Sequence, residues 1–154
     1  MVSKPPRCKN VVELLEWLDV STSFVLVFER PSPCMDLQTF LRMSKNNRLS
    51  EDMAREIMRQ LIQAVSDCID HGVFHGDLHS KNILVNTDTL EVKLTDFSYG
   101  NFVSNFSKMG YASCFRNLGL ILVELISGDV HIDYSDEIIK KCSQVVSPVH
   151  MNRD

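Results

Sequence analysis

Hydrophobic residues recur at helical spacing through the middle of the chain, and this is its strongest pattern. Apolar positions three or four residues apart predict an amphipathic helix from Ser50 to Asp70. Ser50 is a suitable N-cap, Glu51 and Asp52 suit the first turn of a helix, and Gly72 ends it. The face that we expect in the core comprises Ala54, Ile57, Met58, Leu61, Ile62, Val65, Cys68 and Ile69.

Two short apolar segments precede this helix. Val11–Leu15 and Phe24–Phe28 both predict strands, and the unbroken apolar run of the second predicts a fully buried one. Glu29–Pro33 contains two prolines, so we expect a connector there. Asp36 is suited to cap a short helix that continues through Met43.

The second half of the chain alternates between short strands and helices, so we predict an α+β fold with segregated elements. Helices dominate it, and the strands form short hairpins. The expected elements are strands Ile83–Val85 and Val92–Leu94 around a polar turn at Asn86–Thr89, a mostly apolar helix Leu118–Ser127 closed by Gly128, and a last short helix from Asp133 or Ser135 through Cys142.

Composition narrows the class of protein without indicating its chemistry. The 154 residues suit one folded domain, and a net charge of −4 argues against a nucleic-acid partner. The longest apolar run, Leu118–Val123, is too short to span a membrane, and no signal peptide is visible. Five cysteines without a Cys-x-x-Cys pair favour a reducing compartment, so we expect the cytoplasm, or the nucleus.

Polar residues with catalytic potential gather between the long helix and the second pair of strands. Asp77 lies in a loop, Asn82 follows five residues later, and Asp96 stands at the end of a predicted strand. In phosphoryl transfer, one acid accepts the proton of the attacking hydroxyl, while an amide and a second acid hold magnesium. This spacing therefore indicates a phosphoryl-transfer site that uses a nucleotide and Mg²⁺.

These motifs resemble those of the protein kinases. The stretch from His75 to Asn82 matches the catalytic loop His-Arg-Asp-Leu-x-x-x-Asn, and Asp96-Phe97-Ser98 is similar to Asp-Phe-Gly. The resemblance is greatest to Pim-type serine/threonine kinases and covers about residues 10–141. The further segments that carry it are Ser23–Pro33 with Asp36-Leu37, His71–His75, and Gly128-Asp129-Val130 with Asp136–Ile139.

The resemblance implies one partial kinase domain and a role for each site residue. Residues 10–28 would be the last strands of the small lobe, 29–35 the hinge, and 36–154 a truncated large lobe. Transfer of the ATP γ-phosphoryl group to a protein Ser or Thr is then the expected reaction. The implied roles are Asp77 as catalytic base, His79 in place of a catalytic-loop Lys, Asn82 and Asp96 as magnesium ligands, Glu29 and Pro31 facing adenine, Phe28 as gatekeeper, Leu84 under the base, and Asp36 at the ribose.

Departures from the family pattern predict weak activity for this chain. The first glycine is Gly72, so the chain contains no Gly-x-Gly-x-x-Gly loop, and no strand Lys or Ala-Pro-Glu motif is found. Gly76 replaces an Arg and Ser98 replaces a Gly, while Lys81 stands where the Pim pattern has an acid. We expect weak ATP binding, no transfer above background, and self-association through an incompletely covered Leu118–Ser127 helix.

Two other functions remain open at this stage. The chain could be a binding-only pseudokinase fragment that engages a kinase partner or a protein substrate without phosphorylating it. Alternatively, His75, Asp77 and His79 alternate along one segment, as the ligands of a transition metal in a hydrolase can. The second alternative leaves Asn82, the hinge prolines and Asp96 without a role.

Overall fold

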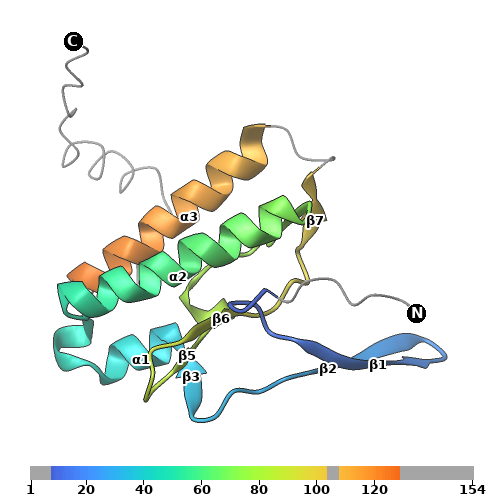
Figure 1. Cartoon of the computed structure of the whole chain (residues 1–154), viewed down its shortest axis with the longest axis horizontal. Coiled ribbons are helices and arrows are strands. Elements are labelled where there is room, and N and C mark those ends of the chain that lie inside the picture. Colours follow the sequence, from blue (N-terminus) through green and yellow to red (C-terminus); the bar gives the residue numbers. More distant parts are fainter. Residues whose placement is uncertain (1–7, 104–107, 129–154) are drawn as a thin grey trace.

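The computed structural model describes residues 8–103 and 108–128, so the expected last helix through Cys142 lies outside the described residues. Two long helices lie side by side, and a hairpin extends away from them (Figure 1). The architecture is α+β, as expected. The elements are strands β1 (Leu14–Val20), β2 (Ser23–Phe28), β3 (Cys34–Asp36), β4 (Val73–Phe74), β5 (Ile83–Asn86), β6 (Val92–Leu94) and β7 (Asn101–Phe102); helices α1 (Leu37–Met43), α2 (Glu51–Asp70) and α3 (Lys108–Ser127); and 3-10 turns Lys45–Asn47 and Ser80–Asn82.

Helix α2 confirms the prediction made from hydrophobic spacing. The Ser50 hydroxyl accepts a hydrogen bond from the Met53 amide at 3.4 Å, which satisfies one of the free donors at the helix start. The predicted face is buried except at Ile62, which is 53% exposed, and at the half-buried Ile69. Ile62 lies instead on the open side of the α2–α3 pair, in a shallow groove with Leu122. The prediction for Ile62 was therefore wrong.

The core lies between α2, α3 and the sheet β3–β5–β6. The inward side chains of β5 and β6 alternate with outward ones, as the two-residue period of a strand requires. The inward set is fully buried and belongs to one core cluster with side chains of α1, α2 and α3. The set is Ile83, Val85, Val92 and Leu94.

Helix α3 begins at Lys108, well before the expected start at Leu118. The preceding turns include polar and small residues, which carry little hydrophobic periodicity, so the sequence pattern shows only the apolar second half. Ile121 and Leu125 are buried against α2, whereas Leu122 and Ile126 are 40% and 48% exposed. Among the described residues, no helix is long and apolar enough to cross a membrane.

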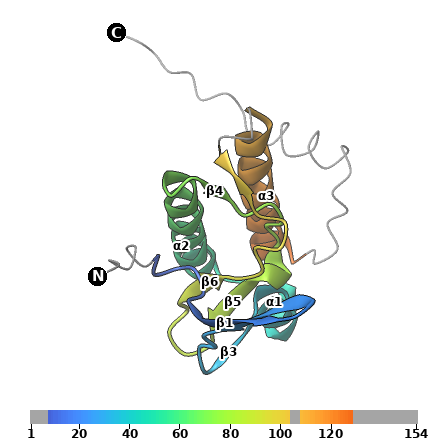
Figure 2. The same cartoon turned by 90° about the vertical axis from the view of Figure 1, so that its right-hand side faces the viewer.

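The first two strands form a separate antiparallel hairpin, and here the sequence expectations were wrong in two respects. The first strand covers Leu14–Val20, while Val11 and Val12 instead contact Leu94 of β6 through a bridge and a 2.9 Å hydrogen bond. Strand β2 was expected to be buried, yet each of its residues is exposed. The hairpin extends away from the body in Figure 1, and in Figure 2 it is seen from its far end, in front of α1 and β5. An apolar run can therefore predict a strand without predicting what covers it.

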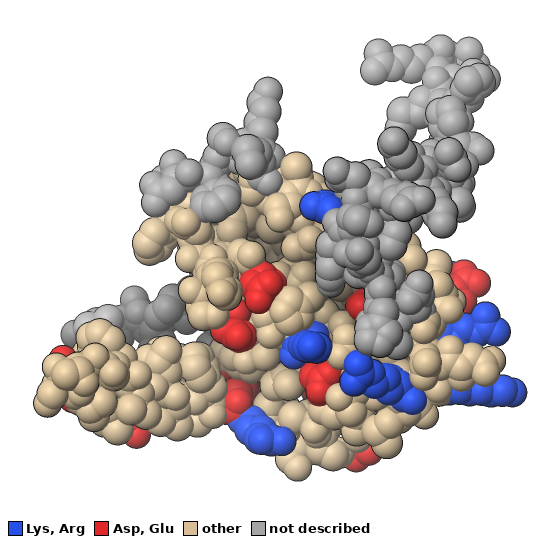
Figure 3. Space-filling view, turned by 180° about the vertical axis from the view of Figure 1, so that it is seen from behind, with Lys and Arg blue, Asp and Glu red and all other residues tan. Residues whose placement is uncertain are grey.

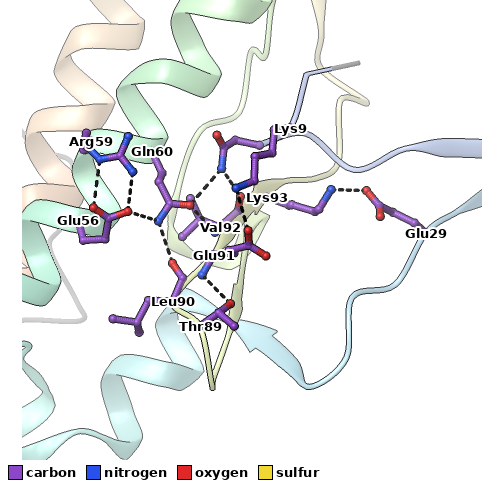
Figure 4. A network of polar contacts seen from close by, with 11 residues as sticks. Lys9, Glu29, Glu56, Arg59, Gln60, Thr89, Leu90, Glu91, Val92 and Lys93 are labelled. Carbon is purple, nitrogen blue, oxygen red and sulfur yellow. Dashed lines mark hydrogen bonds and ion pairs between the residues drawn. The ribbon is translucent and has the colours of Figure 1, made fainter. Parts of the chain in front are cut away.

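A buried glutamine joins α2 to the sheet. The Gln60 side-chain oxygen accepts from the Val92 amide at 3.0 Å and from the Asn10 side chain at 3.1 Å. Its nitrogen donates to Glu56 and to the Leu90 carbonyl, both at 2.9 Å (Figure 4). Gln60 is 6% exposed, so these bonds satisfy polar groups that water does not reach.

Replacing Gln60 by alanine is expected to lower the free energy of unfolding by about 1–3 kcal/mol, because buried groups of Val92 and Asn10 lose their partner. Gln63→Ala is the matched control on the same helix, since Gln63 is exposed and its side-chain nitrogen donates to the neighbouring exposed Asp67 at 2.8 Å. The control is expected to stay within about 0.5 kcal/mol of the parent chain. Urea unfolding followed by circular dichroism measures both variants, and equal effects would contradict the role given to Gln60.

Candidate active site

The loop between β4 and β5 presents Asp77 and His79 because the residues that alternate with them are buried. Leu78 and Ser80 are 3% and 2% exposed and fix the loop on the core. Asp77 and His79 consequently stand half-exposed on the other side. The loop then closes in the turn Ser80–Asn82, where the His79 ring accepts a 3.2 Å hydrogen bond from the Lys81 amide.

Asp77 and Asn82 are held in direct contact. The Asn82 amide nitrogen donates to the Asp77 backbone carbonyl at 3.0 Å and to its carboxylate at 3.2 Å. Both donors of Asn82 thus face Asp77, which leaves its side-chain oxygen as the atom that could meet a cation. The same Asp77 carboxylate oxygen lies 3.2 Å from His79 Nε2. The structure thus brings Asp77 and Asn82 together.

His75 is a buried structural residue that links the loop to Thr95, just beyond β6. Its Nε2 lies 2.8 Å from the Thr95 carbonyl, and its Nδ1 accepts from the Asp77 amide at 3.3 Å, which identifies Nε2 as the protonated nitrogen. Burial lowers the pKa of His75, so the ring is neutral at pH 7. The ring also lies against Phe97, with 4.4 Å between centroids.

The alternative metal triplet of His75, Asp77 and His79 is not supported. Both ring nitrogens of His75 are engaged with the backbone, so neither is available to a metal. Within residues 8–103 and 108–128, no group of three or more His, Cys, Asp or Glu side chains is placed to hold a metal ion. A hydrolase site of that kind therefore has no basis in this fold.

Asp96 lies just beyond β6 in a left-handed conformation, with φ of 61°. The Thr95 amide donates to the Asn82 carbonyl at 3.0 Å, which ties this segment to the loop that contains Asp77 and Asn82. Asp96 is exposed, and Ser98 donates to its Oδ1 from the hydroxyl at 2.6 Å and from the amide at 3.2 Å. These hydrogen bonds lower the pKa of Asp96, which therefore carries a negative charge at neutral pH.

Gly76 is required by the close approach of the segment after Asp96. Its φ is +83°, and a Cβ at this position would overlap the carbonyl oxygen of Tyr99. An L-residue would suffer both from the left-handed backbone and from this contact. The Arg that the resemblance places here therefore does not fit this backbone, and glycine allows the two segments to pack.

The outer face of the sheet β3–β5–β6 lies next to the connector Glu29–Pro33 and carries several predicted site residues. The strand register places Asp36, Leu84 and Lys93 side by side on this face, which is less buried than the opposite one. Lys93 Nζ lies 2.6 Å from Glu29 Oε1, and both side chains are about one-quarter exposed (Figure 4). The same Glu29 oxygen accepts from the Glu13 amide at 2.9 Å. The ion pair therefore joins the connector Glu29–Pro33 to β6.

The other residues that we expected to contact the nucleotide differ in their burial and in their contacts. Asp36 uses one carboxylate oxygen for the Thr39 amide at 2.8 Å and the other for the Thr39 hydroxyl at 2.7 Å, so it caps α1 as predicted. A ribose hydroxyl at this site would share those oxygens. Phe28 ends β2 and is 45% exposed, while Pro31 is half-buried in the connector.

Two features of the site could not be read from the sequence. The sequence comparison of Ser98 with glycine concerned backbone freedom only, whereas its hydroxyl contacts Asp96 directly. The Glu29–Lys93 pair joins residues 64 positions apart, and no local pattern relates them.

The donor atoms at the site fit magnesium. The Asn82 oxygen and the Asp96 carboxylate are hard oxygen donors of the kind that suits this ion, which keeps several waters and needs few protein ligands.

Comparison with known proteins agrees with this geometry. A family model described as the protein kinase domain matches residues 2–119. The chain is 37% identical to the serine/threonine-protein kinase prk-2 of Caenorhabditis elegans over 97 residues, which cover 63% of the chain and 22% of that protein. It is 26% identical to the serine/threonine-protein kinase pim-2 of Danio rerio over 156 aligned positions, which cover 88% of the chain and 50% of that protein. The chain thus spans half or less of these relatives.

Proposed function

The chain belongs to the protein kinase family, and from this premise we propose that residues 75–98 form the phosphoryl-transfer site of a Pim-like serine/threonine protein kinase. The observation that carries the proposal is the contact of Asp77 with Asn82, together with the backbone bond that ties the segment before Asp96 to Asn82. The names of the relatives, which are serine/threonine kinases, support the same class of reaction.

Asp77 is suited to act as the catalytic base. Its carboxylate is half-exposed, so a protein Ser or Thr hydroxyl can reach it, and Asn82 and His79 fix its orientation. In this proposal Asp77 accepts the hydroxyl proton as the oxygen attacks the γ-phosphorus of ATP. His79 contacts the same carboxylate and acts as a positioning residue in place of the Lys of the family motif.

In this proposal the chain supplies the large-lobe side of the site for the cation and the nucleotide. Asn82 and Asp96 would bind Mg²⁺, which when bound neutralises phosphate charge. Leu84 would lie under the adenine, with Glu29 and Pro31 of the hinge at its edge. Phe28 as gatekeeper and Asp36 at the ribose complete the proposed pocket.

For the 154-residue chain alone we propose weak ATP binding and no transfer above background. The chain has no glycine before Gly72 and so no Gly-rich loop to cover the phosphates.

One observation also favours the second candidate function, a binding-only pseudokinase. The Ser98 hydroxyl lies 2.6 Å from Asp96 Oδ1, so a cation would compete with Ser98 for that oxygen.

Asp96→Ala is expected to abolish any rise in melting temperature that Mg-ATP gives, because the substitution removes a charged magnesium ligand. Asp88→Ala is the matched control, since Asp88 is an exposed carboxylate in the β5–β6 turn. Thermal unfolding with and without Mg-ATP measures both variants. A shift that survives in Asp96→Ala would remove Asp96 from the site.

Transfer is tested separately with radiolabelled ATP and a Ser/Thr peptide, run beside Asp77→Asn. Background incorporation by both chains is the expected result. Incorporation above background that disappears in Asp77→Asn would identify the chain as an active kinase, and the binding-only candidate would then be rejected.

A further inference from the structure

The loop that carries Asp77 places a lysine on the same side as this carboxylate. Every second residue from 78 to 82 is buried, with at most 8% of its surface exposed. The residues between them are accessible, since Asp77 and His79 are half-exposed and Lys81 is exposed. Asp77 and Lys81 therefore both project from the loop away from the core.

Hydrogen bonds within the loop fix Lys81 relative to Asp77. The Asn82 side chain donates to the Asp77 carbonyl at 3.0 Å, and the Asn82 amide donates to the His79 carbonyl at 2.9 Å. The Lys81 amide in turn donates to the His79 ring at 3.2 Å. The position of Lys81 beside the proposed base thus follows from bonds among residues 77–82 alone. It does not depend on which further segments surround this loop.

The charge of Lys81 is not used by the loop itself. It is the one lysine or arginine between His75 and Asn82. The Asp77 carboxylate is contacted by His79 and Asn82 instead, each at 3.2 Å. Among the residues that the structure describes, Lys81 takes part in no ion pair. Its ammonium group, on a flexible four-carbon stem, can therefore pair with a carboxylate of another molecule.

Selection of a charged peptide on this molecule depends on individual residues. On the described part of the face in Figure 3, acidic and basic side chains are interspersed over the body of the protein. A surface of mixed charge does not steer a peptide through one broad field. A cation next to the base then has the greatest influence on a substrate that reaches Asp77.

We propose that Lys81 selects protein substrates that carry an acidic residue close to the Ser or Thr that meets Asp77, an inference that rests on the proposed kinase function. Four residues span at most about 14 Å, and an extended peptide rises about 3.3 Å per residue. The acid is therefore expected within about four residues of the Ser or Thr. Because an exposed ion pair is weak, it is expected to improve binding about two- to fivefold over a neutral residue.

Carbodiimide coupling of the full chain to a peptide tests the position of this contact. The reagent joins a carboxylate to a lysine amine beside it. The peptide has one Ser, blocked ends and a single Glu, which is moved through four positions on either side of the Ser. Mass spectrometry is expected to find the peptide on Lys81 more often than on Lys45. Equal coupling at the two lysines, or no coupling at Lys81, would overturn the proposal.

Lys45 is a suitable reference because it is an exposed lysine in another part of the molecule. It begins the turn Lys45–Asn47, which approaches Gly128 at the end of α3. The loop of Asp77 follows Phe74, whose ring lies 5.1 Å from that of Tyr111 near the start of the same helix.

Fluorescence anisotropy of labelled peptides tests the role of charge. Lys81→Glu is expected to reverse the preference, so that a peptide with Arg in place of Glu binds better. Lys81→Arg retains the charge and is expected to bind as the parent chain does, while giving no coupled product at position 81. Lys45→Glu makes the same charge change elsewhere and is expected to leave the preference unaltered. A preference that survives in Lys81→Glu would refute the role of this residue.

The melting shift with Mg-ATP, measured on the same variants, separates this inference from the proposed function. A shift in the parent chain without any preference between the peptides would reject the role of Lys81 and leave the kinase site in place. A preference without any shift would retain Lys81 and reject the nucleotide site. A shift that disappears in Lys81→Glu would place Lys81 at the phosphates of the nucleotide and overturn its assignment to the peptide.

Discussion

Gly76→Ala is expected to destabilise the folded chain by about 2–5 kcal/mol, the sum of left-handed backbone strain and a steric overlap. The φ of +83° disfavours an L-residue, and the new methyl group would meet the Tyr99 carbonyl oxygen. Because that oxygen belongs to the backbone, rotation of a side chain cannot relieve the overlap. The segment after Asp96 would have to move away from the catalytic loop.

Gly72→Ala separates the two contributions. Gly72 has a similar φ of +79°, but a Cβ there would meet nothing within 4 Å. Its replacement is expected to cost only the backbone strain, about 1–2 kcal/mol. Urea unfolding of both variants gives the difference, which reports the contact with Tyr99. Equal losses would mean that the two segments do not approach as described.

Leu61→Ala is expected to lower the free energy of unfolding by about 2–5 kcal/mol, through lost burial and the cavity left behind. The Leu61 side chain has no exposed surface and lies on the face of α2 that packs into the core. A loss of this size is a large part of the stability of an ordinary small domain. The variant is expected to melt early or to be unfolded at room temperature.

Ile62→Ala is the matched control, one residue further along the same helix. Ile62 is 53% exposed, so alanine removes a similar volume of side chain without leaving a buried cavity. A loss below about 1 kcal/mol is expected, partly offset by the better helix propensity of alanine. Calorimetric melting of the two variants tests which face of α2 is inside. A larger loss for Ile62→Ala would reverse the assignment.

The helix α2 could be predicted because its signal is repeated. Several apolar positions at helical spacing agree with a capping serine at one end and a glycine at the other. Strand β2 shows the opposite case, since five adjacent apolar residues have no periodicity that identifies a covered face. Whether such a strand is buried depends on elements remote in sequence. The burial of Gln60 likewise depends on Asn10 and Val92, which no local pattern connects to it.

The candidate site divides in the same way. Asp77, Asn82 and Asp96 follow from spacing, because five residues of loop and one short strand pair leave little freedom in their placement. The side-chain contacts that surround these residues were not predicted. Ser98 donates to Asp96, and Lys93 of β6 donates to Glu29 of the connector, and both contacts depend on side-chain directions that the folded backbone determines.

The projecting hairpin also makes the stability of this molecule uneven. Its strands lack a buried core, so their hydrogen bonds can open locally while α2, β5 and β6 stay folded. The amide hydrogens of the hairpin would therefore exchange with solvent faster than those of α2, β5 and β6. Glu29 lies at the boundary between them, bonded to the Glu13 amide on one side and Lys93 on the other. The adenine end of the proposed nucleotide site thus follows the opening of the hairpin, while the Asp77 end follows global unfolding.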